Sequence, residues 1–148
     1  MKYLIGTVVL AFALCSCAAN KSSPKSSGET TLSHNITIGE SGGFTGNNEG
    51  YTIDSTGMVK SFKGIMTQDP TEKLRGRLNE QQMQKINGLI TELLKIKYSE
   101  KGNLTSYITL RSGNTVTNYS WPGPSLGKDV PEPVSRFYTE LTNIINSL

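Results

Sequence analysis

The chain has little of the side-chain chemistry on which most metal sites and thiol-dependent enzymes rely. Its 148 residues include two cysteines, Cys15 and Cys17, and one histidine, His34. Both cysteines lie at the end of an apolar N-terminal segment, so the remainder has no thiol for a disulfide, a metal site or a nucleophile. One histidine beside carboxylates alone is a poor ligand set for zinc. We therefore expect no metal and no cofactor in the folded part.

The apolar N-terminal segment is typical of a secretory leader. Lys2 gives it a positive start, and residues 4–14 are apolar but too few to span a bilayer, which needs about 20 residues. The sequence at residues 14–17, Leu-Cys-Ser-Cys, resembles the bacterial lipobox, which implies that residues 1–16 are removed and that Cys17 becomes the lipidated N-terminus. The alternative is an ordinary signal peptide cleaved near residues 18–19.

A polar stretch follows the predicted lipidation site. Residues 17–32 are rich in Ser, Lys and Gly and have few apolar side chains, so we expect a flexible tether. Acyl chains on Cys17 would hold the protein at a membrane of the bacterial cell envelope. By resemblance to known lipoprotein sorting, the absence of Asp at position 18 favours the outer membrane.

Strongly clustered charge is also missing. The net charge is +3, and it becomes +2 once Lys2 leaves with the leader. Nucleic-acid binding requires a clustered basic face, which this scattered excess does not provide. We expect no nucleic-acid partner and one domain, residues 33–148, because the chain is too short for a second core.

Periodicity predicts an α+β fold in which an antiparallel sheet of about five strands carries two helices on one face, in the order β-β-β-α-β-β-α. Strands are expected at residues 35–40, 51–54, 58–65, 104–110 and 115–121, and residues 66–77 are interpreted as a loop. Asn79 and Gln82 predict a capping box that starts a helix ending near Lys97. A second helix is expected from residues 132–133 onward.

Candidate catalytic groups are sparse. His34 lies at the predicted domain edge, and no G-x-S-x-G motif accompanies it, so a Ser/His/Asp site is not expected. The acidic residues fall mainly in turns and on polar helix faces, where charge is usually solvated. We predict that the protein is not an enzyme; a deep pocket lined by two or more carboxylates would favour a hydrolase instead.

Two segments are candidates for contact with a partner. The first is the glycine-rich segment Ser41, Gly42, Gly43, Phe44, Thr45 and Gly46, which is either a plain hairpin loop or a loop whose glycines allow close approach, with Phe44 as an apolar anchor. It lacks the Lys-Ser/Thr ending of a phosphate-binding loop. The second is Trp121, before a Pro-Gly-Pro loop, which either covers the core or is exposed for recognition.

The first strand and the segment that follows it, residues 36–46, resemble the opening of the emfourin-like proteins, small inhibitors of thermolysin-like metalloproteases. The similarity continues through the helix at residues 80–97, the hairpin at residues 105–121 and the entry to the last helix at residues 130–134. A tethered N-terminus and a longer insertion at residues 60–77 are departures from that family. The resemblance implies that residues 41–46 contact a protein partner.

Three hypotheses follow. The first is a cell-envelope lipoprotein that binds another protein, with inhibition of a thermolysin-like metalloprotease as the implied activity. The second is a non-catalytic structural or assembly lipoprotein of the envelope, and the third is a hydrolase. Exposure of Phe44 and Trp121 side by side would favour the first hypothesis.

Overall fold

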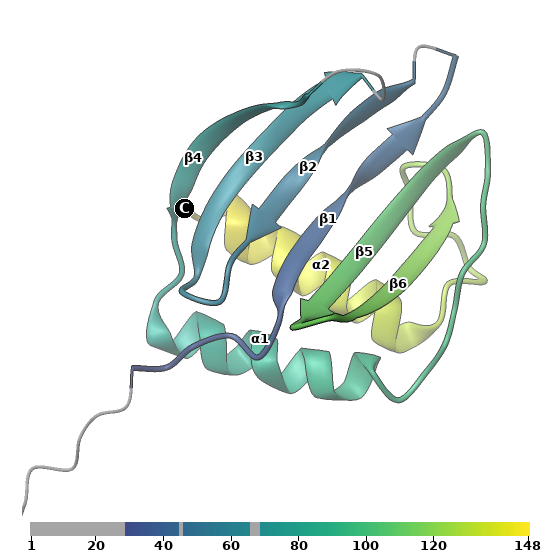
Figure 1. The fold of residues 1–148 in the computed structure, drawn as a ribbon. Helices are drawn as coiled ribbons and strands as arrows, with labels where there is room; N and C mark the ends of the chain where they lie inside the picture. The colour runs from purple at the N-terminus through teal and green to yellow at the C-terminus, as the bar shows by residue number, and fades with distance from the viewer. Residues whose placement is uncertain (1–28, 45, 66–68) are drawn as a thin grey trace, which may run out of the picture.

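A single sheet organises the part of the chain that the computed structural model describes, residues 29–44, 46–65 and 69–148. All six strands are antiparallel, in the order β4-β3-β2-β1-β5-β6, and both helices lie on one face of the sheet (Figure 1). The predicted leader, Cys17 and the first part of the predicted tether lie outside the described residues. The elements are β1 (Asn35–Gly42), β2 (Asn47–Ile53), β3 (Met58–Ile65), β4 (Thr71–Arg77), α1 (Glu80–Leu93), β5 (Leu104–Ser112), β6 (Thr115–Pro122) and α2 (Glu132–Asn146).

The α+β class is confirmed, but the sheet has six strands and not five. The additional strand is β4, in the segment interpreted from the sequence as a loop. It pairs with β3 at the edge of the sheet, and all but one of its residues are exposed. An edge strand without buried side chains shows no apolar alternation, so its sequence gives no strand signal.

The first hairpin is tighter than the sequence suggested. Strands were expected at residues 35–40 and 51–54, but β1 continues to Gly42 and β2 already begins at Asn47. Ser41 pairs with Asn48 across this hairpin, so the first two residues of the glycine-rich segment belong to β1.

The helices follow the sequence closely. Asn79 and Gln82 form the predicted capping box, and the buried side of α1 contains Met83, Ile86, Ile90 and Leu93. The helix ends at Leu93 and not near Lys97, and Leu94 is exposed. No helix in the described ranges is long and apolar enough to cross a membrane.

The core lies between the sheet and the helices. In β1 the buried Ile36 and Ile38 alternate with residues on the opposite face. Ile36 is paired with Ile53 on one side and Leu110 on the other, so apolar side chains continue across the sheet. The helices cover this surface with Phe137 and other buried side chains.

The residues that lead into β1 are packed on the domain, although residues 17–32 were expected to be tether. Leu32 is buried, and its N–H donates to the carbonyl oxygen of Ser55 at 2.9 Å. Two hydrogen bonds join the Asn87 side chain to Thr31 and Ser33. The folded part therefore includes the last residues of the predicted tether.

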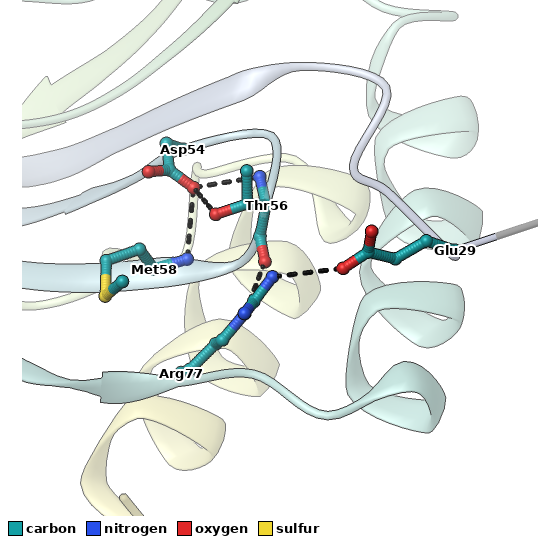
Figure 2. Close-up of polar contacts among 5 residues, drawn as sticks. All are labelled: Glu29, Asp54, Thr56, Met58 and Arg77. Atoms are coloured by element: carbon teal, nitrogen blue, oxygen red, sulfur yellow. Dashed lines mark hydrogen bonds and ion pairs between the residues drawn. The ribbon is translucent and has the colours of Figure 1, made fainter.

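Figure 2 shows how the turn between β2 and β3 is held next to this entry. One carboxylate oxygen of Asp54 accepts from the N–H and the hydroxyl of Thr56, at 2.8 and 2.7 Å, and from the N–H of Met58 at 3.1 Å. Arg77 donates to the carbonyl oxygen of Thr56 at 3.0 Å and pairs with Glu29 at 3.3 Å. This network connects the turn, the end of β4 and the start of the described chain.

Candidate functional site

The turn between β1 and β2 presents Phe44 to solvent. Gly42, Gly43 and Gly46 have positive φ angles of 107°, 72° and 62°, which residues other than glycine rarely adopt. The N–H of Gly43 donates to the carbonyl oxygen of Asn103 at 2.7 Å, which ties the turn to the connection before β5. Phe44 has a relative exposure of 105%, the highest of the large apolar side chains in the described ranges. The turn therefore holds an aromatic ring away from the domain.

The predicted contact residues do not share one location. Ser41 and Gly42 belong to β1, Gly43, Phe44 and Gly46 belong to the turn, and Thr45 lies outside the described residues.

Trp121 does not reach the surface. It is fully buried in β6, on the helix-facing side of the sheet, where its ring meets Tyr138 of α2 edge to face with centroids 5.0 Å apart. The strand alternation that buries Tyr119 also buries Trp121, because the two are two residues apart. Of the two alternatives, Trp121 covers the core, and it is not a contact residue in this conformation.

A cleft that the sequence analysis did not predict lies between the sheet and α2. Its volume is about 650 Å³, within the range of ligand-binding sites. The floor consists mainly of helix-facing residues of β1 to β4, and Gly39, Gly50 and Phe62 from the row between them complete it. Tyr138 and Thr142 of α2 form the opposite wall. The sequence of β1 contains one indication of the cleft. Glu40 continues the two-residue alternation of Ile36 and Ile38, so this charged residue lies on the same face as the core.

Charged residues occupy two neighbouring rows of this floor. The first row, from β1 to β4, is Glu40, Glu49, Lys63 and Thr71, and the second row is Ile38, Tyr51, Ser61 and Lys73. Glu49 and Lys63 form an ion pair of 2.8 Å. Neither Glu40 nor Lys73 forms an ion pair within the described part of the chain. The cleft is therefore acidic on β1 and basic on β4.

Titration of the cleft residues reflects this layout. Burial raises the pKa of the Tyr138 phenol, and the neighbouring Glu40 carboxylate and Tyr51 raise it further. The hydrogen bond to Glu49 and the charge of that carboxylate raise the pKa of Lys63. Tyr138 remains a neutral hydrogen-bonding group next to Glu40 at ordinary pH.

Glu40 and Glu49 provide the two carboxylates in one pocket that the hydrolase hypothesis requires, but the rest of the arrangement suits binding better. Glu49 is exposed and already paired with Lys63, whereas a general acid needs a carboxyl group in an apolar environment. His34 precedes β1 at the end opposite Glu40, about 20 Å away at 3.4 Å per residue. No group of three or more potential metal ligands occurs in the described ranges.

No protein-family model matches this chain, and a comparison with curated proteins gave no match either. The similarity to emfourin-like proteins therefore stays a prediction from residues 36–46 and the order of the elements.

Proposed function

We propose that this chain is a lipoprotein of the bacterial cell envelope whose domain binds another protein. The lipobox-like sequence that ends in Cys17 supports the lipid anchor. The absence of Asp at position 18 favours the outer membrane as its location. The observation that carries the binding function is Phe44, an aromatic side chain held fully in solvent by a turn of glycines. Such a side chain is a frequent anchor of protein interfaces when it enters a pocket of the partner.

Inhibition of a thermolysin-like metalloprotease is the specific activity we propose. In this mechanism the turn blocks the protease cleft and takes no part in chemistry. The narrow hairpin and the exposed ring are compatible with insertion into a cleft, and the glycines leave the backbone accessible to the partner.

The lipid anchor is tested by labelling cells with a palmitate analogue. Cys17→Ser is expected to abolish labelling, because serine has no thiol to accept the lipid. Cys15→Ser is the matched control and is expected to keep the labelling. Labelling that survives Cys17→Ser would show that the anchor has been assigned to the wrong residue.

The inhibitor activity is tested with the mature chain, residues 17–148, purified in detergent and added to a thermolysin-like protease. We expect inhibition at micromolar concentration, weakened about tenfold or more by Phe44→Ala because anchors of this type contribute strongly. Leu74→Ala is the control, since Leu74 is also exposed, at 66%, but lies on β4. Lack of inhibition, or equal loss in both variants, would contradict the proposal.

A structural or assembly role in the envelope is the alternative function. Photo-crosslinking from position 44 in intact cells separates it from the binding function. A defined crosslinked protein supports binding through the turn, whereas the absence of any crosslink would favour the structural role.

A further inference from the structure

The cleft between the sheet and α2 has an electrostatic arrangement that the fold itself leaves unbalanced. Glu40 and Glu49 stand directly opposite each other on β1 and β2, and like charges in that position destabilise a sheet. Lys63 compensates Glu49 only. Glu40 thus remains a half-buried carboxylate without a cationic partner among the described residues.

The surroundings of Glu40 are suited to a positive group. Tyr51 and Tyr138 both line the cleft beside it, one from the sheet and one from α2. A carboxylate combined with aromatic rings attracts an ammonium or guanidinium group by charge and by the cation–π interaction. A ligand cation at this position would supply the compensation that Glu40 lacks.

The opposite end of the cleft is suited to a negative group. Lys73 lines the cleft from β4 and has no acidic partner within the described ranges. Three inter-strand steps of about 4.8 Å and two residues along the strand separate Glu40 from Lys73, so their Cα atoms lie about 16 Å apart. Four residues of extended peptide span at most about 14 Å, and the long side chains of Glu40 and Lys73 can cover the remainder, so a peptide of this length reaches from one charged group to the other.

We propose that this cleft is a second binding site, independent of Phe44, for a short extended peptide. Its positive group lies at Glu40 between the tyrosines, and its carboxylate lies at Lys73. Between these ends the peptide crosses the strands, where Ser61 and Thr71 offer hydroxyl groups for hydrogen bonds. The volume of about 650 Å³ accommodates a ligand of this size.

The test uses the mature chain, residues 17–148, labelled with nitrogen-15 and titrated with tetraalanine, whose ends carry one charge of each sign. We expect saturable shifts of the amide signals of Glu40, Tyr51 and Tyr138, with a Kd of about 1 mM or tighter. Acetylation of the peptide's N-terminus and amidation of its C-terminus are each expected to weaken binding about tenfold. Equal binding of the blocked peptides would overturn the proposal.

Protein variants locate the site. Glu40→Gln and Lys73→Gln are each expected to weaken tetraalanine binding about tenfold, with Glu40→Gln reducing the benefit of the peptide's ammonium and Lys73→Gln that of its carboxylate. Glu72→Gln is the matched control, because Glu72 belongs to β4, like Lys73, but pairs with Lys60 on the face of the sheet away from the cleft. Phe44→Ala should leave peptide binding unchanged, so this test and the protease assay fail independently. Absence of saturable shifts, or full binding by both cleft variants with native-like spectra, would overturn the proposal.

Discussion

Replacing Gly50 with alanine tests the close approach of β1 and β2 at the centre of the sheet. Gly50 is paired with Gly39, so two glycines face each other where larger residues are usual. A methyl group at position 50 would overlap the carbonyl oxygen of Ile38 and lie 2.6 Å from the Cα of Gly39. Both contacts are with backbone, which no side-chain rotation relieves.

The size of the effect follows from these contacts. A Cβ atom essentially never lies within 3.0 Å of an atom to which it is not connected through the chain, so β1 must move away from β2. Overpacking of this kind costs about 1–3 kcal/mol. The movement also strains the neighbouring hydrogen bonds, each contributing about 1 kcal/mol. Alanine reduces the entropy of the unfolded chain, which returns about 0.4–1 kcal/mol. If one hydrogen bond is lost, we expect a net loss of about 1–4 kcal/mol in the free energy of unfolding.

Urea unfolding followed by the fluorescence of Trp121, the single tryptophan, measures this loss. Gly88→Ala is the control, because Gly88 lies in α1 and a methyl group there would have no neighbour within 4 Å beyond the adjacent residues and the backbone of its own helix. Alanine in a helix interior is favoured over glycine by about 0.8–1 kcal/mol, so the control should stabilise the protein. Replacement of glycine by alanine is thus expected to lower the free energy of unfolding at position 50 and to raise it at position 88. If Gly50→Ala unfolds within about 0.5 kcal/mol of the parent, the reasoning about close approach is refuted.

Two further predictions concern the turn and the entry of the chain. Although burial by itself raises the pKa of Asp54, hydrogen bonds from Thr56 and Met58 and the charge of Arg77 outweigh it, so the pKa is lowered. The carboxylate therefore stabilises the fold above about pH 4, the pKa of Asp in the unfolded chain, and this stabilisation is lost as the pH falls through the lower pKa of the folded state. In urea titrations, the difference in the free energy of unfolding between the parent and Asp54→Asn should be largest at neutral pH and shrink below about pH 4. Leu32→Ala should cost about 2–5 kcal/mol in thermal or urea unfolding, because it removes a buried side chain, whereas Thr31→Ala, at an exposed side chain, should cost under about 1 kcal/mol.

Elements whose sequence contains a complete local signal were predicted well. The start of α1 is an example, since Asn79 and Gln82 form their capping hydrogen bonds within three residues of each other. The buried face of α2 likewise follows from apolar residues three and four positions apart. Such signals depend on neighbours along the chain and need no knowledge of the rest of the fold.

Strand β4 shows where local signals fail. Its residues, Thr71–Arg77, are charged or polar apart from Leu74 and Gly76, and Leu74 is exposed. The strand exists because the edge of β3 offers hydrogen bonds, and Lys60 adds an ion pair to Glu72 at 3.0 Å. An exposed ion pair contributes little, so pairing with β3 is the main cause. The sequence of residues 71–77 does not indicate that the edge of β3 is available for pairing.

The cleft could not be derived from sequence for a related reason. Its acidic end comes from β1, its basic end from β4, the ion pair between them from β2 and β3, and its wall from α2, so five elements have to be placed before it exists. Trp121 was ambiguous for the same reason: its strand position fixes which face it occupies, but only the placement of α2 covers that face. Alternation predicts the face of a side chain, and the tertiary arrangement decides whether that face is open.

The position of these features along β1 determines how an anchored protein would present them. The chain reaches the domain at Glu29 and enters β1 at Asn35, while the turn with Phe44 lies at the other end of that strand (Figure 1). The two ends of this eight-residue strand are seven residue steps, or about 24 Å, apart. Glu40 lies within two residues of the far end, so both proposed binding sites are distant from the point of entry. If Cys17 carries the lipid, the tether attaches to the end of the domain opposite its binding surfaces, and both surfaces remain accessible to partners away from the membrane.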